Sequence, residues 1–162
     1  MNIIIRKFKN EDIHSIESIW NEVIDEGESF FWKEHFSTNK ILEILNNQKA
    51  IYCSEFNREV IGFYILHGNF PGRGKHISNA LYAIKKEFRG KGIGKMLGQH
   101  SIEIAKECGY KAMQFNSVVS TNIASVCLWE GLGFIRVGQI KNAFIKYNNE
   151  IVDIYIYHKS FY

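Results

Sequence analysis

RGKGIGK, residues 89–95, follows the apolar run of residues 80–84 and opens an amphipathic stretch. This order predicts a strand, a glycine-rich turn and the N-terminus of a helix. Glycines let the backbone approach a ligand closely, and the first amides of a helix have no partner within it. The helix dipole adds positive potential at the same end. The stretch therefore predicts an anion site, and we expect it to bind a phosphorylated cofactor.

Three glycine motifs compete for this loop. A dinucleotide fold needs G-x-G-x-x-G, but the third glycine position holds Leu97, and the next predicted strand carries Asn116 rather than an acid. A P-loop needs a hydroxyl after its lysine, but Lys95 is followed by Met96. The remaining pattern is Arg-x-x-Gly-x-Gly. On the glycines alone, an ordinary glycine-rich turn stays open as an alternative.

The composition is typical of one globular domain, expected to span residues 1–162. The chain is 46% hydrophobic and 23% charged, and its net charge of +3, without a run of Lys and Arg, argues against a nucleic-acid partner. No signal peptide and no apolar run of membrane length are found, so we expect a cytoplasmic protein without a membrane partner. Three cysteines without metal spacing and histidines without a metal motif predict reduced thiols and no metal.

The hydrophobic pattern predicts an α/β fold with the element order βααβββαβαββ. Residues 10–12 are expected to cap the first helix, and Gly27 to end it. A hairpin is expected from residues 50 to 67. The expected strands are residues 3–8, 50–55, 60–67, 76–84, 112–119, 134–139 and 152–159, and the helices follow residues 10, 38, 92 and 122. We predict a single mixed, mostly antiparallel sheet with helices on both faces.

Two motifs in this order resemble those of the GNAT superfamily of N-acetyltransferases. The glycine turn is the first, and NIASVCLWEGLGF, residues 122–134, is the second. The resemblance spans nearly the whole chain, and it implies the superfamily's fold and acetyl-CoA as co-substrate. Residues 71–73, 76–79 and 115–118 look similar to the branch that acetylates azetidine-2-carboxylate and related proline analogues. The implied reaction is transfer of an acetyl group to the amine of a small molecule, expected to be an amino or imino acid.

The resemblance also implies a set of cofactor-binding residues. The loop amides, with Arg89 shaping the loop, would hold the pyrophosphate. The end of the preceding strand would pair with pantetheine, and Asn122 would bond the same arm, although a plain helix cap explains Asn122 equally well. The expected cofactor-binding residues are Ile84, Lys86, Arg89, Gly90, Lys91, Gly92, Ile93, Gly94, Lys95, Asn122, Ser125 and Trp129.

Trp129 departs from the superfamily pattern. Many members carry a tyrosine there, whose hydroxyl can protonate the leaving thiolate, and an indole cannot do this at neutral pH. We expect either that Tyr155 or Tyr147 replaces it, or that the thiolate leaves unassisted.

The acceptor amine must be neutral to react, and a carboxylate is expected to take its proton. Glu26 and Glu28 lie in the loop where such enzymes shape the acceptor pocket, and solvated loop acids are the alternative reading. An asparagine at a strand end can hold an acceptor carboxylate without adding charge. The expected acceptor-binding residues are Asn79, Asn116, Phe31 and Arg73.

Two rival functions share the phosphate loop. One is a non-catalytic acyl-CoA-binding sensor domain, and the other is an acetyltransferase acting on a protein N-terminus. The expected partners are a small-molecule amine or amino acid and, in a homodimer, a second copy of the chain.

Overall fold

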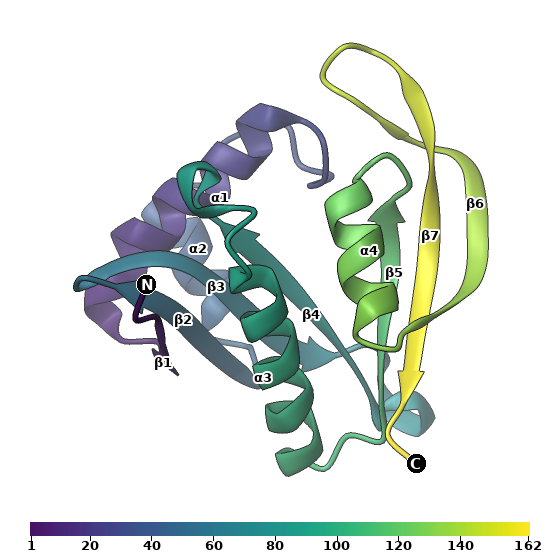
Figure 1. Ribbon diagram of the computed structural model, residues 1–162, viewed down its shortest axis with the longest axis horizontal. Coiled ribbons are helices and arrows are strands. Elements are labelled where there is room, and N and C mark those ends of the chain that lie inside the picture. The colour runs from purple at the N-terminus through teal and green to yellow at the C-terminus, as the bar shows by residue number, and fades with distance from the viewer.

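The computed structural model describes residues 1–162 and follows the predicted element order (Figure 1). The strands are β1 (Ile4–Lys7), β2 (Ala50–Phe56), β3 (Glu59–Gly68), β4 (Ile77–Ile84), β5 (Ala112–Val119), β6 (Ile135–Ile145) and β7 (Ile151–Ser160). The α-helices are α1 (Ile13–Glu26), α2 (Thr38–Leu45), α3 (Ile93–Glu107) and α4 (Ile123–Gly131). Short 3-10 turns are η1 (Asn10–Asp12), η2 (Gly72–Gly74) and η3 (Lys86–Phe88).

The strands form one sheet in the order β1-β2-β3-β4-β5-β7-β6. Every pair is antiparallel except β4–β5, which confirms the predicted mixed, mostly antiparallel sheet. The parallel pair holds only at Ile77 with Ala112 and Ser78 with Met113, and beyond it β4 and β5 diverge (Figure 1). β5 also bulges between Phe115 and Val118. The sheet therefore has a gap in its middle.

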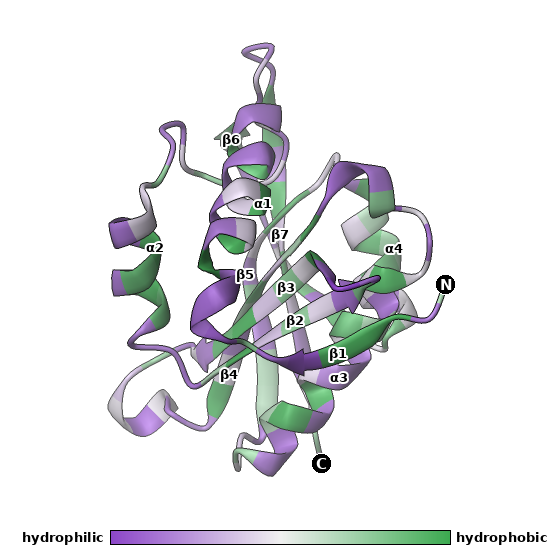
Figure 2. Cartoon of the chain, turned by 90° about the vertical axis from the view of Figure 1, so that its left-hand side faces the viewer, coloured by the Kyte–Doolittle hydropathy of each residue, from purple (hydrophilic) through white to green (hydrophobic).

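Helices cover both faces of the sheet, as predicted (Figure 2). One core cluster joins α1 and α2 to the sheet through Ile16, Trp20 and Ile41. The other joins α3 and α4 through Leu97 and Trp129. Burial of apolar side chains on both faces supplies the main driving force for the fold.

The alternation of side chains along β4 feeds both clusters. Ala80 and Tyr82 pack with the α3–α4 cluster, whereas Leu81 and Ala83 pack with the α1–α2 cluster. Side chains of β4 beside the gap therefore lie on both faces of the sheet.

Most strand ends lie within one residue of the expected positions, but the end of β6 and the capping of α1 differ from the sequence-based expectation. β6 continues to Ile145 instead of ending at residue 139, because bulges between Ile140 and Phe144 break the alternation that marks a strand. Asp12 does not cap α1 with its side chain. Gly27 does end α1, with a left-handed φ of 59° that suits glycine.

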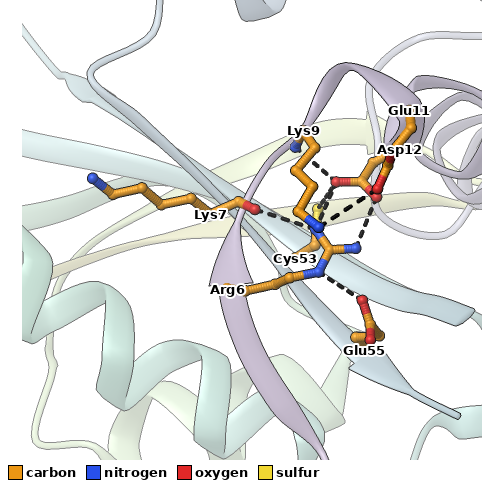
Figure 3. A network of polar contacts seen from close by, with 7 residues as sticks. All are labelled: Arg6, Lys7, Lys9, Glu11, Asp12, Cys53 and Glu55. Atoms are coloured by element: carbon orange, nitrogen blue, oxygen red, sulfur yellow. Dashed lines mark hydrogen bonds and ion pairs between the residues drawn. The ribbon is translucent and has the colours of Figure 1, made fainter. Parts of the chain in front are cut away.

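The carboxylate of Asp12 belongs to a polar cluster that ties β1 to β2 (Figure 3). Arg6 donates to both Asp12 oxygens at 2.7 and 2.9 Å and to Glu55 at 2.6 Å, and the Lys9 amide donates to Asp12 at 2.8 Å. Asp12 is only 5% exposed, and its bonds from Arg6 hold the pKa of its carboxyl below the usual range. Burial raises the pKa of the nearby Cys53 thiol to about 12, so this cysteine is a poor nucleophile at neutral pH.

Asp12→Asn should destabilise the fold by about 1.5–3 kcal/mol at pH 7, because hydrogen bonds to a charged partner are lost. A carboxyl with a lowered folded-state pKa stabilises the fold above its unfolded value of about 3.9, and this stabilisation is lost as the pH falls through the folded value. Urea unfolding should therefore show a difference in the free energy of unfolding between Asp12→Asn and the unmodified chain that is large at pH 7 and smaller in acid. The exposed neighbour offers a control, Glu11→Gln, which should stay within about 0.5 kcal/mol. Equal urea midpoints for Asp12→Asn and the unmodified chain would contradict this.

Candidate active site

The glycine turn presents a row of unpaired amides at the start of α3. Gly90 and Gly92 have φ of 73° and 83°, and a side chain at either position would meet only open space. Gly92 is the N-cap of α3 and supplies no capping side chain. The amides of residues 90–95 make no hydrogen bond within the chain. Free donors and the dipole of α3 therefore converge on one exposed point that suits an anion.

Arg89 ties this turn to the rest of the molecule. Its Nε donates to the carbonyl of Ile84 at 2.8 Å, and its Nη1 donates to both carboxylate oxygens of Glu26 at 2.9 and 2.7 Å. The end of β4 and the end of α1 are thus joined through one guanidinium. The structure places Glu26 against Arg89 and beside a polar surface hollow, not in the cavity described below.

The gap between β4 and β5 opens into a cavity of about 410 Å³. Residues from the loop after α1, both strands and α4 line it. Of the residues predicted from the sequence, the cavity brings together Phe31, Asn79, Asn116, Asn122, Ser125 and Trp129.

The cavity passes through the sheet. Tyr82 and Trp129 line it from the side of α3 and α4, whereas Leu81 and Phe30 line it from the side of α1 and α2. His67 pairs directly with Asn79 across β3 and β4, so both side chains lie on the same face as Leu81. Two molecules can therefore meet in this cavity from opposite faces of the sheet.

The free edge of β4 carries backbone groups that point into the gap. The Ala80 amide is bonded by its neighbour's side chain, Asn79 Oδ1, at 2.7 Å and not by β3. In an antiparallel pair, the groups of alternate residues point the same way, so those of Tyr82 and Ile84 also face the gap. The Ile84 carbonyl is already taken by Arg89, and its amide remains for a ligand.

Aromatic packing holds the loop after α1 over the cavity. Phe30 and Trp32 lie 5.6 and 5.4 Å from the buried ring of Trp20, and Phe31 lies 5.0 Å from Phe144 of β6. These contacts anchor the loop and line the cavity at once.

The β6–β7 hairpin holds the same loop from its other side. The Tyr147 amide donates to the Gly27 carbonyl at 3.0 Å, and Lys146 lies 3.4 Å from Glu28. Glu28 is therefore paired with a cation and does not line the cavity.

Three further predicted residues also lie outside the cavity. The ring of Tyr155 is covered by the Arg136 guanidinium, whose Cζ lies 4.0 Å from the ring centroid. Arg73 is exposed in η2. The Lys86 amide donates to Glu22 at 3.1 Å on the outer side of α1. Their proposed roles stay predictions.

His67 is a site residue that sequence reasoning missed. It and Tyr82 are the titratable side chains of the cavity lining. Burial raises the pKa of Tyr82, and its hydroxyl bonds Ser101, which itself donates to the Gly98 carbonyl. The His67 Nδ1 lies 2.9 Å from the Gly68 carbonyl, which can only accept, so in the neutral imidazole Nδ1 is assigned the proton and Nε2 keeps a lone pair. The signal in the sequence was a histidine at the end of an apolar strand, which by itself suggests no role.

The structure gathers no three metal-ligating side chains in one place. None of its helices combines the length and the apolar character needed to cross a membrane.

Comparison with known proteins gives relatives over most of the chain. The family described as "Acetyltransferase (GNAT) family" matches residues 12–134. N-acetyltransferase aca1 from Schizosaccharomyces pombe is 34% identical over 143 residues, which are 85% of this chain and 68% of that protein.

Solved structures show the same fold. A GCN5-related N-acetyltransferase from Kribbella flavida is 26% identical with a TM-score of 0.92, covering 98% of this chain and 97% of that one. A GNAT superfamily phosphinothricin acetyltransferase from Sinorhizobium meliloti, in complex with AcCoA, is 20% identical with a TM-score of 0.92, covering 99% and 89%.

Proposed function

Because the chain belongs to the acetyltransferase (GNAT) family, we propose that it transfers the acetyl group of acetyl-CoA to the amine of a small amino or imino acid. The observation that carries this proposal is the cavity through the sheet, which Tyr82 and Trp129 line from the side of α3 and α4 and which Leu81 and Phe30 line from the side of α1 and α2. Proline analogues are the acceptors that the resemblance of residues 71–73, 76–79 and 115–118 favours within this class.

Two features beside α3 fit acetyl-CoA, namely the unpaired backbone amides of the glycine turn and the free edge of β4. The amides of residues 90–95 would hold the pyrophosphate, and pantetheine would run along β4 beside Tyr82 and Ile84. The Tyr82 amide, which faces the gap inside the cavity, would donate to the thioester carbonyl, and the Ile84 amide would bond the arm nearer the glycine turn. Asn122 and Trp129 would border the arm from α4. Bound acetyl-CoA supplies the activated acetyl thioester.

The acceptor side has a base and neutral donors. His67 Nε2 would accept the proton of the attacking amine, because the cavity holds no carboxylate and the Tyr82 hydroxyl is committed to Ser101. Side-chain amides of Asn79 and Asn116 would hold the acceptor carboxylate. Tyr155 lies under Arg136, so we propose that the thiolate leaves without a protein acid, as the low pKa of thiols (about 8.5 for cysteine) allows.

Initial-rate kinetics with acetyl-CoA and a panel of amino acids tests this proposal. Since both substrates would meet in one cavity, double-reciprocal plots should intersect, which indicates a complex with both substrates bound. Parallel plots, which indicate a covalent acetyl-enzyme, would contradict the two-sided cavity. Tight acetyl-CoA binding without turnover of any amine would favour the sensor domain, and turnover of peptides alone would favour N-terminal acetylation.

Asn116→Ala should lower kcat/KM for amino-acid acceptors by an equivalent of about 1–3 kcal/mol, because a hydrogen-bonding partner of the carboxylate is lost. The affinity for acetyl-CoA should hardly change. Steady-state kinetics on an amino acid and on its decarboxylated amine measures this. Asn39→Ala, on the exposed face of α2, is the control and should behave like the unmodified chain. An equal loss for both acceptors would remove Asn116 from carboxylate binding.

A further inference from the structure

Asn69, just after β3, joins the two asparagines of the cavity although it does not line the cavity itself. Its Oδ1 accepts from Asn116 Nδ2 at 2.7 Å and from Asn79 Nδ2 at 3.1 Å. Its Nδ2 donates to Asn116 Oδ1 at 3.2 Å. The Asn69 backbone is held by a bond from its amide to the Ile77 carbonyl at 2.8 Å. One side chain thus fixes both carboxamides at the point where β4 and β5 separate.

The hydrogen bonds of this cluster leave donors in excess. A carboxamide oxygen has two lone pairs and its nitrogen has two hydrogens. Asn69 Oδ1 accepts two bonds, and Asn116 Oδ1 accepts two, from Asn69 and from Gln114 at 3.0 Å. Asn79 Oδ1 accepts from the Ala80 amide. Each Asn79 and Asn116 nitrogen donates one bond and keeps one hydrogen free.

The chemistry of the spare groups selects the ligand. Free N–H donors satisfy a carboxylate, which only accepts, and cannot satisfy an ammonium, which only donates. The cavity lining contains no lysine or arginine that would bind a carboxylate by charge. We propose that Asn69 is a positioning residue that turns the N–H groups of Asn79 and Asn116 toward an acceptor carboxylate. This inference rests on the proposed amino-acid acceptor.

Asn69→Asp is the sharpest test. An aspartate can still accept from Asn79 and Asn116, but it cannot donate to Asn116 Oδ1, and its charge repels a carboxylate. The probes are L-proline and L-alanine, each paired with its carboxamide. We expect kcat/KM for the amino acids to fall by about tenfold to a hundredfold, mainly through KM, while the carboxamides change little. The readout is the ratio of kcat/KM for an amino acid to kcat/KM for its carboxamide. A merely structural role of Asn69 would leave this ratio unchanged.

Two variants complete the design. Asn57→Asp places the same charge in the turn at the other end of β3, at a left-handed position that aspartate tolerates, and should leave the ratio unchanged. Asn69→Ala removes the hydrogen bonds to Asn79 and Asn116 without adding charge, and it should bring kcat/KM for the amino acids close to that for their carboxamides. This variant tests the role of Asn69 if Asn69→Asp does not fold.

The outcomes distinguish the positioning role of Asn69 from the proposed amino-acid acceptor. If the unmodified chain acetylates amino acids and both Asn69 variants keep its preference, the role of Asn69 is overturned while the proposed function stands. If the unmodified chain acetylates only amines that lack a carboxylate, both the acceptor class and the role of Asn69 are overturned.

Discussion

Gly92→Asp should lower the affinity for coenzyme A by about a hundredfold or more while the chain stays folded. Gly92 is the N-cap of α3, and the space around a side chain there is empty, so the substitution creates no clash. An aspartate would place a carboxylate among the unpaired amides that we assign to the pyrophosphate. It would occupy those donors and repel the phosphates. Calorimetric titration with coenzyme A measures the loss.

Gly109→Asp is the matched control for this experiment. Gly109 follows the other end of α3 with a φ of 86°, close to the 83° of Gly92, and it too has open space around it. Any cost of a side chain in the left-handed region is therefore similar in both variants. Unchanged affinity in a folded Gly92→Asp chain, or equal losses in both variants, would refute the phosphate site.

His67→Asn should lower kcat by about a hundredfold to ten-thousandfold, the usual contribution of a general base, with a small change in the KM of either substrate. The asparagine amide can still donate to the Gly68 carbonyl, as Nδ1 does, but it offers no lone pair in place of Nε2. Initial rates at varied concentrations of both substrates give kcat and the two KM values for the variant and the unmodified chain.

His76→Asn serves as the control, because His76 is exposed and lies outside the cavity. Glu26→Gln and Glu28→Gln test the carboxylates expected from the sequence. These should cost far less than His67→Asn, since Glu26 bonds Arg89 and Glu28 pairs with Lys146. A near-normal rate in His67→Asn together with a large loss in either glutamine variant would return the base to that carboxylate.

The element order was predictable because its signals are local. β5 was expected at residues 112–119 and lies there, and α4 follows the Asn122 cap and ends at Gly131 as expected. Capping residues, glycines and apolar periodicity act within a few positions of one another. The strand order, with β7 between β5 and β6, depends on pairing between distant segments that no local pattern encodes.

The candidate site likewise contains residues that a local sequence pattern reveals and residues that only the fold brings together. The glycine turn is contiguous in sequence, and Asn116 is conspicuous as a polar residue in an apolar strand. Glu26 pairs with Arg89, which lies 63 residues further along the chain, so this ion pair depends on how α1 packs against the end of β4. His67 and Asn69 carry no motif, and they become recognisable only when β3 and β4 bring them beside the gap.

The most direct test of the account is to mix the unmodified chain with acetyl-CoA and a panel of free amino and imino acids, and to follow both products. Free coenzyme A is measured with a thiol reagent, and acetylated acceptors by mass spectrometry. We predict that at least one amino or imino acid becomes N-acetylated in equal amount to the coenzyme A released, and that its carboxamide reacts more slowly. Acetyl-CoA binding without an acetylated amino or imino acid would contradict the account.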